Sequence, residues 1–364
     1  MRRGTHWSDA QVLIRTLALG ATARGAHEDR LREAWRPVDH RRVLHLVERE
    51  GAVLWLSRRL RERGISLEEP ARTMLADRAK AAVAQGLRID AELAHVRARL
   101  AGVGIACVAL KGAAMREIAG RVPYASARAP GDVDILCRQE DAEGAWHALA
   151  SSGYASPRKA PDDAHHLPAL VGPRGVGVDI HVTMVAGVSP AEAWRRGTSG
   201  GSGPDDTELF WHAVSHSLAT VAEEAYASLR LRHWLDASAL IAAKAPLDWD
   251  VIRGRIESPE CTHPSLARAW IRVACELAAQ PLPMAVAGES ARLELDRLLG
   301  WRLRLADAPR TRWTHKLLEE GTRGEAGLSQ EPSGAHRNAI IRARHRVASG
   351  AARVYWRAAV RSSA

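Results

Sequence analysis

Apolar residues recur every three or four positions through the first part of the chain. Leu75, Ile89 and Leu93 belong to one such series, which follows Pro70. This spacing places apolar side chains on one face of an α-helix, so it predicts a long amphipathic helix that begins near Pro70. Other stretches before it have the same spacing, and we interpret residues 1–102 as a helical N-terminal segment.

The pattern changes between residues 103 and 185, where short apolar runs alternate with helical stretches. The predicted elements are, in chain order, a strand at 105–110, a helix at 112–119, a strand at 133–137, a helix at 140–151 and two strands at 165–171 and 176–184 around the turn Pro173-Arg174-Gly175. Runs of this length, bounded by turn residues, are typical of strands. The set predicts a small mixed sheet within residues 103–185.

Helical spacing returns in residues 205–306, which we interpret as a helical domain. Residues 186–204 contain a Gly/Ser-rich piece, and we expect a linker or mobile loop there. We expect residues 307–364 to be a basic and partly flexible C-terminal segment. The predicted fold class is therefore α/β (α+β): a small mixed sheet in residues 103–185, between a helical N-terminal segment and a helical C-terminal domain.

Acidic side chains share one face of two predicted strands. Asp132 and Asp134 alternate with apolar residues, and Asp179 and His181 do the same in the last strand. Side chains two positions apart lie on the same face of a strand. If these strands are neighbours, three carboxylates converge, and their mutual repulsion favours a bound divalent metal.

Lys111 and Gly112 stand where a predicted strand ends and a helix begins. Lysine is rare in this chain, with five in 364 residues. A helix start offers free backbone N–H groups and the positive end of the helix dipole, which favour a bound phosphate.

The remaining composition narrows the choice of partner and compartment. The formal net charge is +10, which favours anionic partners such as nucleotides or nucleic acid, although arginine spread over solvated faces explains it equally well. Residues 337–361 hold seven arginines and no acid, so they are a candidate RNA-binding segment. The four cysteines form no CxxC pair, which argues against a zinc site or disulfide framework. We find no membrane span or signal peptide and expect a cytoplasmic protein.

These motifs, in this order, resemble the nucleotidyltransferases of the DNA polymerase β-like superfamily. More narrowly, they resemble a largely uncharacterised branch of it. The matching pieces are Leu110-Lys111-Gly112, Arg128, Asp132-Val133-Asp134-Ile135-Leu136 and Asp179-Ile180-His181, followed by His212 and His216 on one helix and by Leu231-Arg232 and Asp236 on the next. The resemblance covers residues 100–240.

The resemblance implies a specific reaction. Asp132, Asp134 and Asp179 would hold two Mg²⁺ or Mn²⁺ ions and carry the catalysis, while Lys111, Gly112, Arg128 and His181 would contact the nucleotide. An NMP, by default AMP from ATP, would pass to an acceptor hydroxyl with release of pyrophosphate. The acceptor stays open: a small molecule, a peptide, a protein or RNA.

Alternatives remain at several positions. Ala113 stands where the superfamily usually has a phosphate-binding Ser, so either Lys111 and backbone N–H groups replace its hydroxyl or triphosphate binding is weak. Arg128 can instead pair with Asp132 or Asp134.

Two further groups have simpler interpretations. His212 and His216 have metal-ligand spacing, but satisfied helix histidines are the simpler interpretation. Arg232 and Asp236 can form an i,i+4 ion pair.

The competing functions are a metal-dependent glycosyltransferase that uses Asp-x-Asp and a non-catalytic nucleotide-binding or antitoxin-like module.

Overall fold

The computed structural model covers most of the chain before residue 306. The described residues are 7–19, 26–156, 167–184, 188–201, 203–224, 229–243, 247–259, 261, 263–290 and 293–305. The basic C-terminal segment, including residues 337–361, lies outside them.

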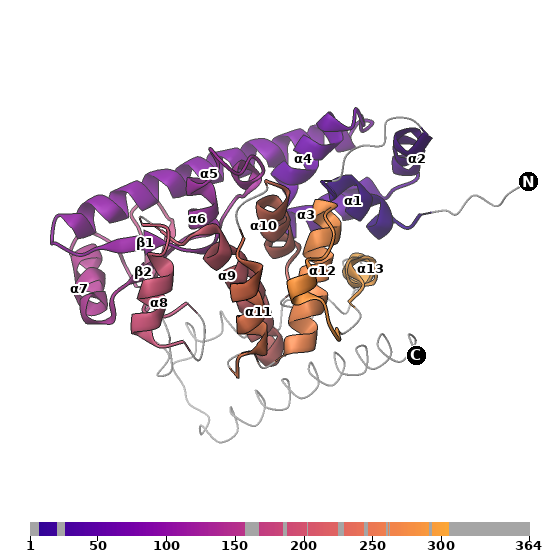
Figure 1. Ribbon diagram of the computed structural model, residues 1–364. Helices are drawn as coiled ribbons and strands as arrows, with labels where there is room; N and C mark the ends of the chain where they lie inside the picture. Colours follow the sequence, from indigo (N-terminus) through magenta and orange to yellow (C-terminus); the bar gives the residue numbers. More distant parts are fainter. Residues whose placement is uncertain are drawn as a thin grey trace, which may run out of the picture.

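A 31-residue helix, α5 (Ala71–Ala101), runs along one side of the molecule (Figure 1). It confirms the long helix predicted from the apolar spacing. Four helices precede it: α1 (Asp9–Leu17), α2 (Ala26–Trp35), α3 (His40–Arg49) and α4 (Val53–Glu62). One end of α5 contacts α3 and α4, and the other contacts the sheet and α7 (Gln139–Ala150). The helix therefore connects the N-terminal helices to the sheet.

The sheet has four strands in the order β1-β2-β4-β3. The strands are β1 (Cys107–Ala109), β2 (Asp132–Cys137), β3 (Leu170–Val171) and β4 (Gly177–His181). The central strands β2 and β4 are parallel, and the two outer pairings are antiparallel. This arrangement confirms the predicted small mixed sheet. The alternation is also as predicted, because the residues between the acidic positions are fully buried: Val133, Ile135, Val178 and Ile180.

The acidic face of β2 is partly covered by α8 (Pro190–Gly197). Leu136 shares this face with Asp132 and Asp134 and packs in a small core with Val108 and Ala193. Helix α8 therefore lies over the C-terminal end of β2, where Leu136 is.

Helix α8 corrects the prediction of a linker or mobile loop at residues 186–204. Ser189 caps the helix by accepting a hydrogen bond from the backbone N–H of Glu192, and Pro190 occupies the first turn. Both residues are typical of a helix start. The Gly/Ser-rich composition that suggested a loop comes mainly from residues 198–203, which follow the helix.

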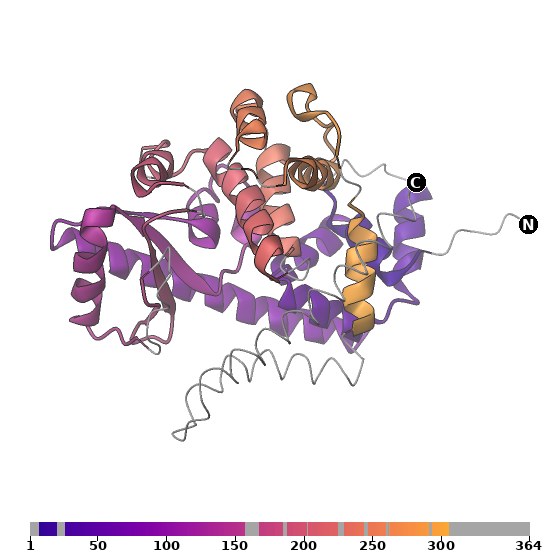
Figure 2. The ribbon, with the colours of Figure 1, turned by 90° about the horizontal axis from the view of Figure 1, so that it is seen from below.

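The helices after the sheet pack back onto the N-terminal ones. They are α9 (Asp206–Glu224), α10 (Leu231–Ala242), α11 (Trp249–Glu257), α12 (Pro264–Ala278) and α13 (Leu295–Leu305). Two short 3-10 turns complete the described elements: η1 (Ala125–Ala127) precedes β2, and η3 (Met284–Val286) lies between α12 and α13. Helix α10 packs between α9 and α12, where Trp234 and Trp270 stack at 5.6 Å. Helix α13 lies against α1 and α3 (Figure 2).

One apolar cluster contains residues from the N-terminal helices, the sheet and the C-terminal helices. These parts therefore share a core. None of the helices in the described ranges is both long enough and apolar enough to cross a lipid bilayer.

The close packing of α8 on the sheet predicts opposite effects for two glycine substitutions. A Cβ atom on Gly197 would lie 2.5 Å from Cδ2 of the buried Leu136, whereas Gly254 in α11 has open space around it. Gly197→Ala should lower the free energy of unfolding by about 1–3 kcal/mol through overpacking. Gly254→Ala should raise it by about 0.5–1 kcal/mol through helix propensity. Urea denaturation measures both, and equal effects would contradict the packing of α8.

Candidate functional site

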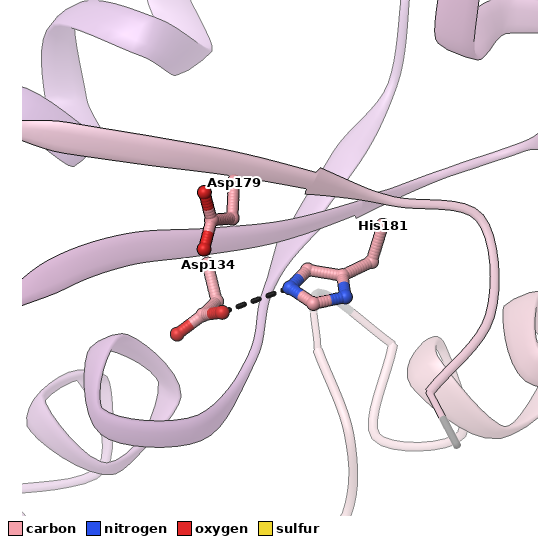
Figure 3. Close-up of side chains that lie close together, drawn as sticks. All are labelled: Asp134, Asp179 and His181. Atoms are coloured by element: carbon pink, nitrogen blue, oxygen red, sulfur yellow. Dashed lines mark hydrogen bonds and ion pairs between the residues drawn. The ribbon is translucent and has the colours of Figure 1, made fainter. Parts of the chain in front are cut away.

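The parallel pairing of β2 and β4 sets Asp134 level with Asp179. His181 lies two residues further along β4 on the same face. The ligand atoms of Asp134, Asp179 and His181 all lie within 4.8 Å of one another (Figure 3). Among the described residues, this is the only group of three or more potential metal ligands whose ligand atoms are all this close together.

Asp134 is the buried carboxylate of the group and has two side-chain partners. It is 4% exposed, and one of its carboxylate oxygens, Oδ1, contacts both Nζ of Lys111 at 2.5 Å and Nε2 of His181 at 2.8 Å. Burial alone would raise the pKa of Asp134, but the hydrogen bond from His181 and the charge of Lys111 outweigh it and hold the pKa well below its usual range. Burial also lowers the pKa of His181, so its neutral ring donates from Nε2 to an ionised carboxylate.

Asp132 lies outside this group, two residues earlier on the same face of β2. Lost hydration around its carboxyl group raises its pKa, and the charges of Asp134 and Asp179 raise it further. Because the residue is exposed, water screens much of this repulsion. The two carboxyl groups of β2 therefore have pKa shifts of opposite sign.

The donor set fits a divalent cation. Asp134 and Asp179 offer carboxylate oxygens at one point, Asp132 is close enough for electrostatic coupling, and hard divalent ions prefer such oxygens. The Lys111 ammonium now provides the positive charge beside Asp134, so a metal at Asp134 would compete with it. The sequence predicts Asp132, Asp134 and Asp179 as ligands, and the structure groups His181 with two of them.

Lys111 reaches Asp134 through an unusual backbone conformation. Its φ angle is 49°, in the left-handed region, which costs a residue other than glycine about 1–3 kcal/mol. The residue before it, Leu110, donates a backbone hydrogen bond to the carbonyl of Asp134 at 2.9 Å. The chain then turns into α6 (Lys111–Glu117). This turn brings the Lys111 side chain beside Asp134.

Gly112 has a packing reason to be glycine. A Cβ atom there would lie 2.8 Å from Cβ of Pro130 and 3.3 Å from Nη2 of Arg128. Glycine therefore lets the loop before β2 lie against the start of α6. Its predicted contact with a phosphate stays a prediction.

Arg128 pairs with Asp236 rather than with Asp132 or Asp134. Its Nε donates to Oδ2 of Asp236 at 3.0 Å, and both side chains are buried. Burial raises the pKa of Asp236, and the charges of Arg128 and Arg232 oppose that shift. The i,i+4 spacing on α10 also allows an ion pair between Arg232 and Asp236, but among the described residues the ion pair of Asp236 is with Arg128. This partner is 108 residues away in the chain, and helix spacing carries no signal for such a contact.

A small cavity lies beside Lys111, and we call it the histidine cavity. Its polar lining is Lys111, Arg128, His212, His216, His233 and Asp236, and its apolar lining includes Met115 and Leu209. The residues come mainly from α6, α9 and α10. The rings of His212 and His216 are stacked, with 5.9 Å between their centroids. The ring of His233 lies edge-to-face with that of His216, with 5.4 Å between the centroids.

His212 corrects the interpretation of satisfied helix histidines. It is 5% exposed, yet neither ring nitrogen has a hydrogen-bond partner among the residues that the structure describes. The spacing of His212 and His216 marked both residues as candidates, but their position beside Lys111 depends on how α9 packs against α6.

The comparison with family profiles decides the family. The profile of a family described as uncharacterised nucleotidyltransferase matches residues 36–274 of the 364-residue chain. The chain belongs to this nucleotidyltransferase family. The resemblance to nucleotidyltransferases is thereby confirmed, while the narrower branch stays a prediction. Searches among curated proteins and among solved structures gave no match.

The family match extends well beyond the sheet. It begins before α3 and ends within α12, so it includes helices on both sides of the sheet and every residue of the site. The residues that line the histidine cavity therefore lie within the matched range.

The opposite pKa shifts on β2 predict opposite effects on stability. Asp134→Asn removes the charge that binds Lys111 and His181, so the free energy of unfolding at pH 7 should fall by about 1–3 kcal/mol. A lowered folded-state pKa means that this contribution is present above the unfolded pKa, about 4, and is lost as pH falls through the folded value. The difference between the wild type and Asp134→Asn should therefore shrink below about pH 4.

Asp132→Asn is the matched control for this measurement. A raised pKa means that ionised Asp132 destabilises the folded state at pH 7, so its removal should leave stability unchanged or slightly higher. Urea denaturation of both variants from pH 3 to pH 7 provides the comparison. An equal loss of stability in both would contradict the roles assigned to Lys111 and His181.

Proposed function

We propose that the protein transfers a nucleoside monophosphate, by default AMP from ATP, to an acceptor hydroxyl. The hydroxyl oxygen forms a bond to the α-phosphorus, the bond from that phosphorus to the bridging oxygen breaks, and pyrophosphate leaves. The observation that carries the proposal is the pairing of Asp134 with Asp179 beside Lys111 in a member of a nucleotidyltransferase family.

Asp134 and Asp179, with Asp132 beside them, are the residues that would hold two Mg²⁺ or Mn²⁺ ions. Such ions, when bound, stabilise the charge that develops on the phosphate and activate the acceptor hydroxyl. His181 keeps Asp134 ionised and fixes its orientation through the bond from Nε2. This support resembles the hydrogen bonds that usually orient ligand carboxylates.

Asp179 is the proposed acceptor of the hydroxyl proton. It is half-buried and makes no ion pair or hydrogen bond through its side chain with the described residues, whereas Asp134 has two partners. Its oxygens are therefore free to face an incoming hydroxyl. General bases act at hydrogen-bond distance from the proton that they remove.

Lys111 is the proposed contact for the leaving pyrophosphate. Its ammonium group lies beside Asp134 at the start of α6 and also lines the histidine cavity. An ammonium group can neutralise charge on departing phosphates. Ala113 has no hydroxyl to share this task, so phosphate binding depends on Lys111, on backbone N–H groups around Gly112 and on further donors nearby.

The rival functions receive less support. A glycosyltransferase with Asp-x-Asp would have alternating strands and helices before that motif, but the described residues before β1 form helices. A non-catalytic nucleotide-binding or antitoxin-like module would not require Asp134 and Asp179 to converge. Transfer assays separate this module from an enzyme.

The acceptor and the setting are part of the proposal. We place the enzyme in the cytoplasm, where NTPs are available, acting on a small molecule, a peptide, a protein or RNA. The RNA option depends on residues 337–361, which lie outside the described residues, and on the net charge.

The reaction predicts severe losses for two conservative variants. Asp134→Asn and Asp179→Asn keep side-chain size but remove charge from the metal-binding group, so the rate should fall by at least about 100-fold. The measurement is pyrophosphate release and transfer of label from α-labelled NTPs to lysate fractions, with circular dichroism as the folding check. EDTA should stop the reaction, and Mg²⁺ or Mn²⁺ should restore it.

Asp77→Asn is the control, because Asp77 is an exposed residue of α5 and its side chain is 67% exposed. This variant should keep full activity. Near-normal transfer by Asp134→Asn would show that the catalytic site lies elsewhere.

A further inference from the structure

The histidine cavity contains polar atoms that the protein alone does not satisfy. Both ring nitrogens of His212 and Nη1 of Arg128 are buried without a hydrogen-bond partner among the described residues. Buried polar atoms in folded proteins are nearly always hydrogen-bonded, and each unsatisfied group destabilises the folded state. His212 and Arg128 both line the cavity, and the N–H group of a neutral His212 ring, like the N–H groups of a guanidinium, requires a partner that accepts hydrogen bonds.

The size of the cavity limits what can enter it. The centres of water molecules can occupy about 30 Å³ of it. On that scale one water requires about 10–15 Å³, so the cavity has room for about two or three waters or one small tetrahedral group. A nucleobase or a sugar is too large.

The charge of the lining favours an anion. Among the lining residues Lys111 and Arg128 are cationic and Asp236 is acidic, and the pair of Asp236 with Arg128 leaves a net positive charge. Burial lowers the pKa of His212 well below its usual value, so the neutral ring offers one N–H group. Among the described residues these three histidines do not form a group with ligand atoms all within 4.8 Å of one another, so the lining gives no support for a metal ion.

We propose that the histidine cavity is a subsite for one phosphate group, which receives hydrogen bonds from His212, Arg128 and Lys111. The inference rests on the proposed function and extends it, because Lys111 connects the cavity to Asp134. The phosphate group comes either from the terminal end of the NTP or from a phosphorylated acceptor. In both cases the chemistry is that of a phosphoryl oxyanion among N–H donors.

The decisive variant is His212→Phe, which keeps a flat ring beside His216 and removes both nitrogens. Replacing an unsatisfied polar group by an apolar one of similar shape is neutral or stabilising, so the melting temperature should stay equal or rise. Affinity for pyrophosphate and ATP should fall about tenfold or more, the effect of one lost hydrogen bond to a charged group, while AMP binding stays unchanged.

Binding to the full chain is measured by calorimetric titration at a constant Mg²⁺ concentration. The matched control is His95→Phe, because His95 is a half-buried residue of α5 that stacks against Tyr154 and lies outside the histidine cavity. If His212→Phe does not fold, the smaller His212→Leu replaces it. Binding is measured without turnover, so these results stand even if the transfer assay of Asp134→Asn contradicts the proposed reaction.

Competition identifies the source of the phosphate. If a saturating non-hydrolysable ATP analogue blocks pyrophosphate, the subsite takes the terminal phosphate of the NTP. If orthophosphate or pyrophosphate still binds to the saturated protein, with a loss in His212→Phe, the subsite takes a phosphate of the acceptor. The proposal is overturned if the wild type binds none of these phosphates, if His212→Phe binds them as the wild type does, or if both His212 variants lose stability.

Discussion

The site depends on one constraint: Asp134 must stay ionised although it is 4% exposed. An unpaired buried carboxylate is costly and would take up a proton instead. His181 and Lys111 both contact the same oxygen of Asp134 and lower its pKa. The parallel register of β2 and β4 brings His181 and Asp179 to this point, and the left-handed turn at Lys111 brings the ammonium group. The catalytic geometry proposed here follows from this pairing.

The rest of the fold packs around that arrangement and shapes its surroundings. Apart from Leu136, the apolar residues of β2 and β4 are buried in the main core, and α8 packs against Leu136 at the far end of the acidic face. On the other side, α6 packs against α9, so the lysine that contacts Asp134 also lines the histidine cavity. One residue, Lys111, therefore faces both the carboxylates and the proposed phosphate subsite.

The sequence predicts the local parts of this picture well, since strand alternation decides which side chains share a face. It therefore places Asp132 with Asp134 and Asp179 with His181, and it predicts Lys111 at the end of a strand. It does not predict contacts between elements distant in the chain. The pairing of Arg128 with Asp236, the exclusion of Asp132 from the closest group and the unsatisfied nitrogens of His212 all depend on tertiary packing. The helix at Pro190–Gly197 was readable from its Ser-Pro start, but the Gly/Ser-rich stretch after it suggested a loop.

The most direct test of the account is a crystal of the protein soaked with Mn²⁺ and a non-hydrolysable ATP analogue. The account predicts anomalous density for Mn²⁺ within about 2.0–2.4 Å of carboxylate oxygens of Asp134 and Asp179, with Nζ of Lys111 moved from Asp134 toward the phosphates. Density for the metal at another place, or bound nucleotide with Lys111 still paired to Asp134 and no metal there, would contradict it.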